Sequence, residues 1–496
     1  MLLKADILFA PEGEKKRALL VFLWIAYALI TALLISNHAP WQDEALAWLI
    51  AREVGWFNIY MEAGGNVSPS LWYYILAVPA KLGFPYESMQ VVHWMGACCA
   101  AGIFLFRAPF SILFKALFIF SFYIAYEHAA IARVYMPTLL LMWGVCSCYA
   151  KRYQRPILYG VLVALLAHTS FFGILIAIFL LIDFLFYREG ALIREQSWAV
   201  VVMSLAILLS VLGFALDKFS WSTYVHPIYF FHPETIRDVF YFSYFAPHSE
   251  HFFPLGIKSL LWRVGPWLGV LYGVLTLWLL KRWRAYGFMS FLILSWLVII
   301  YFSVFKYVWP GPRHYSFCLM FTVMFLWLGK VRYQAEKTRI EDFIGILFLG
   351  SFALGVLGTV AQGYRDFQLP YSGSKRMAEY LIGHKLDDNV FIGHAPVVTA
   401  CILPYMPKAS LWDPRKMKGV RYIHFDALTT ERQGDAEVLS LVDDHFVSSG
   451  KVYLISREPV SQVALKRLRL VYSTEGYKDS LWLYVIKGAG SGKAPN

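Results

Sequence analysis

The chain has 496 residues, of which 58% are hydrophobic and only 16% are charged, and its mean hydropathy is +0.52. Soluble globular proteins have about a quarter of their residues charged, so this composition excludes an ordinary soluble domain and favours an integral membrane protein. The formal net charge of +12 does not indicate nucleic-acid binding, because the basic residues fall in short clusters between apolar runs, as helix-flanking anchors do.

The apolar residues are arranged in runs, and a helix needs about 20 of them to cross a bilayer. The first run follows three basic residues, lacks a small-residue cleavage site and predicts a retained anchor. The run 71–80 is short, contains Pro79 and predicts instead a helix lying at the membrane interface. We predict about eleven spans, near 18–36, 89–106, 110–126, 135–150, 157–169, 171–187, 197–216, 259–280, 287–305, 314–330 and 342–362.

The distribution of Lys and Arg predicts the orientation of these spans. Successive loops lie on alternate sides of the membrane. Basic residues are denser in the loops on the same side as the N-terminus, such as 151–155 and 281–284, than in the longer loops 37–88 and 217–258 on the other side. The positive-inside rule then places the N-terminus in the cytoplasm and both long loops outside. We therefore expect a multi-pass protein of the bacterial inner (plasma) membrane, whose C-terminal domain is periplasmic or extracytoplasmic.

The chain changes character after residue 362. Residues 363–487 are polar, and short β-rich runs such as 390–392 and 451–455 alternate with helical stretches, which predicts a small soluble α/β domain. The tail 488–496 is predicted to be disordered. The expected organisation is a transmembrane domain over 1–362, an extracytoplasmic α/β domain over 363–487, and the tail.

Asp43 and Glu44 directly follow the first span. A carboxylate at the outer edge of a membrane can act as a general base on an acceptor hydroxyl or amine, or can hold a divalent cation beside a phosphate. The structural alternative is that the pair opens and caps the helix that runs through Trp48 towards Arg52.

A second cluster, Tyr126 to Tyr135, lies at the outer end of the third predicted span. Charged residues at such a junction are costly and usually functional, and an outward-facing Arg133 could bind a phosphate. The alternative is a structural pair of Glu127 with Arg133, with Tyr135 at the interface. A third outside loop gathers Lys306, Arg313 and His314 around Pro and Gly residues, and it could cradle a lipid phosphate or send its cations to lipid headgroups.

These features together resemble the GT-C superfamily of membrane glycosyltransferases, especially bacterial relatives of protein mannosyltransferases and aminoarabinose transferases. Members carry an acidic pair after the first helix, matched by Asp43-Glu44, and a His-Pro-Pro-Leu-Tyr-Tyr stretch, for which residues 68–73 are Ser-Pro-Ser-Leu-Trp-Tyr. Bacterial members often have Glu-Ala-Arg-Met-Tyr after the third span, where residues 131–135 keep the arginine and tyrosine without the acid. Residues 168–173, His-Thr-Ser-Phe-Phe-Gly, are similar to a further stretch of those relatives.

The resemblance implies an inverting glycosyltransferase that moves a monosaccharide from a polyprenyl-phosphate donor to a lipid, glycan or protein acceptor among membrane lipids. Asp43 is the expected base, with Glu44 orienting or replacing it. The expected contacts to the donor phosphate and sugar come from two outer loops, namely Glu127, Arg133, Tyr135, Lys306, Arg313 and His314. No nucleotide cofactor is expected, and a divalent cation is left open.

Three other functions compete with this interpretation. A transporter or flippase would need ionisable residues deep in the membrane and often inverted repeats, and only Asp183, near an inner helix end, approaches that requirement. A surface-polysaccharide polymerase would carry a large outside loop late in the chain, whereas here a soluble domain ends it. A membrane scaffold that binds a partner would show no transfer chemistry.

Overall fold

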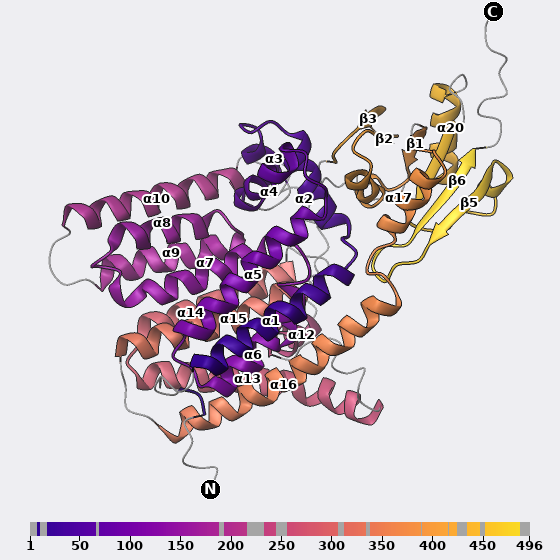
Figure 1. Cartoon of the computed structure of the whole chain (residues 1–496). Coiled ribbons are helices and arrows are strands. Elements are labelled where there is room, and N and C mark those ends of the chain that lie inside the picture. Colours follow the sequence, from indigo (N-terminus) through magenta and orange to yellow (C-terminus); the bar gives the residue numbers. More distant parts are fainter. Residues whose placement is uncertain are drawn as a thin grey trace, which may run out of the picture. The chain divides into compact units, whose positions relative to one another are not determined.

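The computed structural model describes residues 7–9, 17–65, 69–187, 193–215, 233–244, 255–305, 312–333, 338–387, 389–414, 416–423, 434–446 and 452–486. The chain divides into two compact units. Unit 1 comprises Met1–Ile35 and His93–Tyr364, and unit 2 comprises Ser36–Val92 and Arg365–Asn496. Unit 1 is helical, and unit 2 combines helices with a sheet (Figure 1).

Each predicted span coincides largely with helical residues among those that the structure describes. Among the described residues, six helices are long and apolar enough to cross a membrane, and several shorter apolar helices accompany them. The predicted polytopic helical architecture is therefore confirmed. The helices in chain order are α1 (Arg17–Asn37), α5 (Ser88–Arg107), α6 (Ile112–Phe120), the π-helical turn η3 (Phe122–Glu127), α7 (Tyr135–Cys148), α8 (Pro156–Ala167), α9 (Phe171–Phe186), α10 (Arg194–Ala215), α13 (Leu255–Arg282), α14 (Tyr286–Phe305), α15 (Pro312–Tyr333) and α16 (Arg339–Gln368).

Local sequence explains where several helices begin. The side chains of Ser111 and Ser170 cap α6 and α9 by accepting hydrogen bonds from the backbone three residues later. Pro156 and Pro312 occupy the first positions of α8 and α15, where a missing N–H costs nothing. Helices α7, α8, α9 and α10 then lie side by side in unit 1, as Figure 1 shows.

Aromatic side chains fill the interior of unit 1. The Phe104 ring lies 4.5 Å from that of Phe118 and 5.1 Å from that of Trp143, which stacks on Trp327 at 6.0 Å. Trp327 belongs to α15, and 83% of the apolar stretch of that helix is buried, so α15 is a central helix. By contrast α1 leaves Leu29 67% exposed, as expected for a face that contacts lipid.

Unit 2 begins with three helices from the predicted outer loop 37–88. These are α2 (Gln42–Glu53), α3 (Ile59–Gly65) and α4 (Leu71–Lys81), and α4 packs on α2. Helix α4 coincides with the predicted interfacial helix, and its 11 residues reach only about 16 Å. The predicted division counted 37–88 as part of the transmembrane domain, whereas here these residues pack in one unit with the C-terminal part of the chain.

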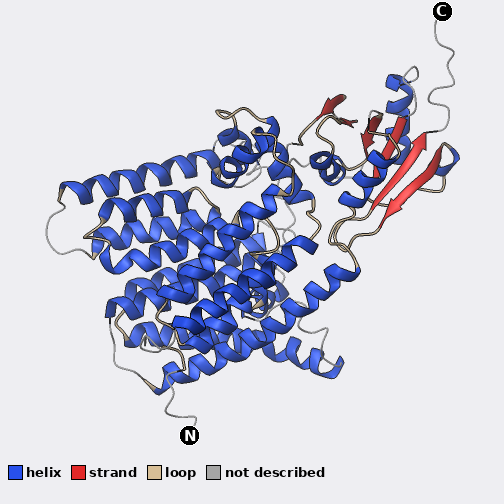
Figure 2. Ribbon diagram, in the orientation of Figure 1, coloured by secondary structure: helices blue, strands red, loops and turns tan. Residues whose placement is uncertain are grey.

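The C-terminal part of unit 2 carries a mixed sheet in the order β3-β2-β1-β4-β6-β5 (Figure 2). Strand β1 pairs in parallel with β2 and β4, while the β2–β3, β4–β6 and β5–β6 pairs are antiparallel. The apolar residues of β1 and β4 are buried on the sheet, which confirms the predicted α/β domain. The strands are β1 (Val390–Gly393), β2 (Leu411–Asp413), β3 (Lys418–Val420), β4 (Val452–Ser456), β5 (Leu468–Thr474) and β6 (Leu481–Ile486), and the accompanying helices are α17 (Ser374–Gly383), α18 (Pro396–Thr399) and α20 (Asp435–Phe446).

One predicted loop contains a helix. Helix α12 (Pro233–Tyr244) lies within the predicted outer loop 217–258 and packs against α13 and α15. The tail 488–496 lies outside the described residues.

Candidate functional site

The predicted site residues separate into two groups. Asp43 and Glu44 belong to unit 2, whereas Glu127, Arg133, Tyr135, Arg313 and His314 belong to unit 1. Lys306 lies outside the described residues.

Glu44 lies in the first turn of α2 and is completely buried. Its Oε2 atom accepts hydrogen bonds from the backbone N–H of Trp41 at 3.1 Å and from Nε2 of His38 at 2.9 Å. A glutamate that binds the amide of the residue before the helix provides half of a capping box. This environment fits the capping interpretation for Glu44 and leaves Asp43, which is only half-buried, as the more accessible carboxylate.

His38 lies between two buried carboxylates. Its Nδ1 atom is 3.6 Å from Oδ2 of Asp366, and its Nε2 atom contacts Glu44. Burial alone would lower the pKa of His38, but the charges and hydrogen bonds of Glu44 and Asp366 outweigh it and raise this pKa to about 10. A histidinium therefore links the end of α1, the first turn of α2 and the end of α16.

A buried acid lies near Asp43. The backbone N–H of Gln42 donates to Oδ2 of Asp479 at 3.4 Å, and Asp479 is almost fully buried. Burial raises the pKa of Asp479 to about 6, and the negative charge of Asp43 adds to the rise. The start of α2 therefore holds two interacting carboxylates, one buried and one partly accessible.

In unit 1 the first turns of α7 and α15 are joined by a hydrogen bond. The Tyr135 hydroxyl lies 3.0 Å from Nε2 of His314, and their rings are perpendicular at 5.9 Å. The Arg133 guanidinium lies 5.7 Å from the centre of the Tyr135 ring, and Arg313 precedes His314 in the first turn of α15. The Tyr135–His314 contact thus joins two helix N-termini, which attract anions through their unpaired amides and dipoles, and Arg133 lies beside it.

His128 contacts the first turn of α15 through Ser316. The Ser316 hydroxyl donates to the carbonyl of Arg313 at 2.7 Å, so it accepts at 3.0 Å from Nε2–H of His128. His93 in turn binds the carbonyl of His128 through its own Nε2 at 3.1 Å. This chain of contacts fixes the His128 ring and holds the Arg313 backbone.

Glu127 ends the π-helical turn η3, in which the His128 amide donates to the carbonyl of Tyr123 at 2.9 Å. The sequence predicted one continuous span over 110–126, but the structure breaks it at Ser121 into α6 and η3. Wide turns of this kind often interrupt helices at functional sites, because they shift the register of the side chains that follow. Here the shift precedes the segment that carries Arg133.

The stretch 168–173 is a close-packed turn between α8 and α9. Ser170 accepts from the Gly173 amide at 3.0 Å and contacts the hydroxyl of Thr138 on α7 at 2.9 Å. Phe172 stacks on Phe317 of α15 at 4.1 Å. The stretch that resembles a family motif therefore positions α7 and α15.

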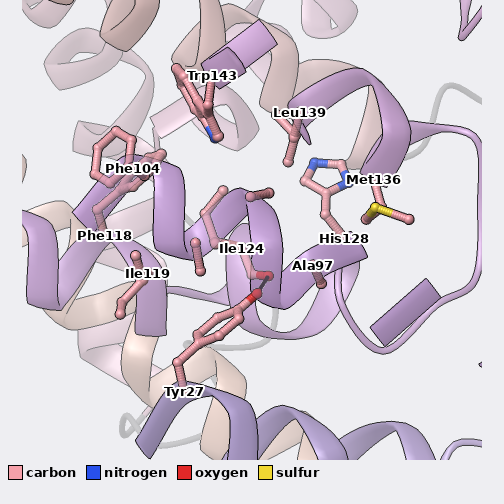
Figure 3. A pocket seen from close by; sticks show the side chains of 12 residues that line it. Tyr27, Ala97, Phe104, Phe118, Ile119, Ile124, His128, Met136, Leu139 and Trp143 are labelled. Carbon is pink, nitrogen blue, oxygen red and sulfur yellow. Dashed lines mark hydrogen bonds between the residues drawn. The ribbon is translucent and has the colours of Figure 1, made fainter. Parts of the chain in front are cut away.

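A small cavity lies in unit 1, lined by Tyr27, His128 and Met136 among apolar neighbours (Figure 3). Its volume is about 20 Å³. That is room for about one water molecule and too little for a sugar or lipid. It is a packing void beside the site.

A Ser–His–Asp arrangement in unit 2 does not form a nucleophilic triad. Nδ1 of His394 is 3.2 Å from the Ser456 hydroxyl, and its Nε2 is 3.4 Å from Asp435. The Ser456 hydroxyl, however, donates to the carbonyl of Glu458 at 2.7 Å and is fully buried. Because the hydroxyl proton is already donated within the turn after β4, these contacts stabilise that turn.

Within the described ranges, no group of three or more His, Cys, Asp or Glu side chains is placed to hold a metal ion.

Sequence reasoning missed three residues of the site. His38 lies only six positions before Glu44, so its proximity could have been noticed. Asp366 follows the end of the last apolar run, where an acid is a detectable signal of a charged partner. Asp479 follows Gln42 by 437 positions, and no local pattern connects the two.

The structure is similar to the crystal structure of ArnT from Cupriavidus metallidurans bound to undecaprenyl phosphate, with 14% sequence identity, a TM-score of 0.52, and coverage of 95% of this chain and 99% of that chain. The apo-state structure of that protein matches with the same identity and coverage and a TM-score of 0.48. No protein-family model matches the sequence, and no curated protein does. The likeness is one of fold, and it extends over nearly the whole of both chains. The chain therefore shares the fold of that ArnT structure over nearly its whole length.

Proposed function

We propose that this chain is an inverting glycosyltransferase that transfers a monosaccharide from a polyprenyl-phosphate donor to an acceptor on the outer face of the membrane. The observation that carries the proposal is the full-length likeness in fold to a structure that holds undecaprenyl phosphate. The residue clusters at the starts of α2, α7 and α15 supply the groups that such a transfer requires.

The transfer needs a base and a positive environment for the leaving group. In the proposed reaction an acceptor hydroxyl or amine attacks the anomeric carbon, and its proton passes to the Asp43 carboxylate. The bond between the anomeric carbon and the phosphate oxygen breaks, and polyprenyl phosphate leaves with the electron pair. Arg133 and Arg313, with the helix N-termini at Tyr135 and His314, stabilise the phosphate.

The environment of Asp183 speaks against a transporter. Asp183 accepts a hydrogen bond from the Tyr149 hydroxyl at 2.7 Å and from the Arg332 guanidinium at 2.9 Å, and Arg152 lies 3.7 Å away. A carboxylate paired with two arginines and a tyrosine stabilises the packing of helices. It is not placed to bind and release an ion, as the coupling group of a transporter must.

The test is transfer by the purified full-length chain in lipid nanodiscs with a polyprenyl-phosphate sugar as donor. Asp43→Asn should lower the rate by about 10²–10⁴-fold, because the amide cannot take the proton. Glu475→Gln, an exposed acid of unit 2, is the matched control and should keep the wild-type rate. Wild-type turnover by Asp43→Asn would remove Asp43 from the mechanism, and absence of any transfer by the wild type would end the proposal.

Donor binding, measured on the same preparation, distinguishes the role of the base from that of the phosphate contacts. Arg133→Ala and Arg313→Ala should each weaken donor binding about tenfold to a hundredfold, the effect of one charge-assisted hydrogen bond. Asp43→Asn should bind the donor as the wild type does. Arg→Lys should restore only part of the affinity, because lysine lacks the planar fork of arginine.

A further inference from the structure

Unit 2 contains an open cavity of about 300 Å³. It lies among the end of α1, the start of α5, the end of α16 and the first turn of α17. Ligand sites begin at about this size, and 300 Å³ admits one small polar molecule such as a single sugar ring. None of the residues assigned above to the base or the phosphate lines it.

Four charged side chains line this cavity without an ion pair among the described residues. Glu87 directly precedes α5, and Lys375, Arg376 and Glu379 belong to α17. All four are exposed, so water can reach them and a ligand can replace that water. They offer carboxylate acceptors and cationic donors at one opening.

Two tyrosines, Tyr86 buried and Tyr405 half-buried, form a more apolar part of the lining. Tyr86 is only 4% exposed, and its ring meets that of Tyr405 at 5.0 Å, edge to face. The hydroxyls of both have no hydrogen-bond partner among the residues that the structure describes. Burial raises the pKa of Tyr86 well above its usual value, so its hydroxyl stays protonated and remains a donor. A buried donor without a partner is costly, and a bound ligand would satisfy it.

The charge of the cavity decides which ligand class it suits. Three acids, Asp366, Glu87 and Glu379, face three bases, His38, Lys375 and Arg376. A phosphate or another strongly anionic ligand would meet as many carboxylates as cations, so the cavity does not favour it. An uncharged sugar suits this balance, because its hydroxyls can donate to carboxylates and accept from cations, while its C–H face packs on tyrosine.

We propose that this cavity binds one neutral sugar unit of a glycan acceptor. The inference rests on the proposed glycosyl transfer and narrows its acceptor to a glycan. It assigns Glu87 and Tyr86 to the sugar hydroxyls and the exposed cations of α17 to the opposite edge of the ring.

The test is saturation-transfer NMR on the full-length chain in nanodiscs without donor lipid. The probes are methyl glucoside, methyl galactoside, methyl mannoside and N-acetylglucosamine, with inorganic phosphate as the anionic comparison. At least one neutral sugar should receive saturation, and phosphate should not compete with it. Glu87→Gln should weaken binding about tenfold and Tyr86→Phe about threefold to tenfold, the effects of losing a charged and a neutral hydrogen bond. Glu475→Gln should bind as the wild type does.

The experiments distinguish failure of the sugar-site proposal from failure of the proposed transferase function. If donor transfer is present but no neutral sugar binds, or if Glu87→Gln binds as tightly as Glu475→Gln, the sugar site is wrong and the transferase proposal stands. Binding of phosphate in place of sugar also overturns it. If a sugar binds and both cavity variants weaken it while no transfer occurs, the site stands and the proposed function fails.

Discussion

Asp43 and Glu44 are adjacent at the start of α2, but their side chains have different environments and roles. Glu44 points into the protein, where it caps the helix and accepts from His38, and Asp43 remains partly accessible beside Asp479. Successive helical residues diverge by about 100° around the axis, so one member of an acidic pair can be structural while the other meets substrate. The pair should therefore not behave as two equivalent acids.

His38 makes the stability of the protein depend on pH in a predictable direction. Its pKa is about 6.5 in an unfolded chain and about 10 in the fold. Below pH 6.5 both states hold the proton, and the stabilisation by Glu44 and Asp366 is complete. Between 6.5 and 10 folding must take up a proton, so stability falls by up to about 1.4 kcal/mol per pH unit, and the contribution is lost above pH 10.

The measurement is the thermal midpoint of the chain in detergent from pH 6 to 10. The wild type should lose stability across this range more steeply than the double variant Glu44→Gln/Asp366→Asn, in which His38 no longer faces two carboxylates. Equal slopes would show that the histidinium contributes nothing to the fold.

Whole elements are positioned by short turns as much as by their apolar faces. The 168–173 turn contacts α7 through Thr138 and α15 through Phe172, and those two helices begin at the Tyr135–His314 contact. The turn therefore sets the distance between the two helix N-termini that the proposed function uses for phosphate. A distortion of the turn should affect the fold first and donor binding as a consequence.

Gly173 provides the test at this scale. A Cβ atom there would lie 2.2 Å from the carbonyl oxygen of Leu166 and 2.3 Å from the hydroxyl of Thr169. Gly173→Ala should therefore destabilise the protein by about 1–3 kcal/mol, the cost of overpacking. Gly350→Ala on α16 is the control, because nothing lies within 4 Å of its added methyl group and alanine favours a helix. A thermal midpoint for Gly173→Ala equal to that of Gly350→Ala would contradict the observed packing.

For the whole molecule, the packing of residues 36–92 with residues 365–496 in one unit bears on topology. Segments that pack together in a water-soluble part of the chain must lie on the same side of the membrane. The charge distribution predicts that this side is the exterior.

A topology reporter tests this assignment. A periplasm-active reporter fused after residue 362 should be active, and one fused in the turn after Arg282 should be inactive. A cytoplasm-active reporter should give the opposite pattern. Cytoplasmic activity after residue 362 would mean that the number of crossings is even, whereas the predicted spans give an odd number, and 71–80 would be the first segment to reconsider.

The sequence by itself determined the helical membrane architecture, the α/β C-terminal domain and the family resemblance. These follow from local quantities, since the length of an apolar run, the flanking charges and a two-residue alternation can be recognised without knowing the neighbours in space. It also singled out Arg133, Tyr135 and His314 as candidates, because charges and polar rings at the ends of apolar runs stand out in composition.

Only the tertiary structure decided how these residues are combined. It showed that Glu44 is buried as a helix cap while Asp43 stays partly accessible. It also placed Asp366 and Asp479 beside the start of α2 and brought Tyr135 into contact with His314. It also broke a predicted span at Ser121. The reason is that a pairing across 437 positions depends on the packing of every helix between them, and no window of local sequence contains that information.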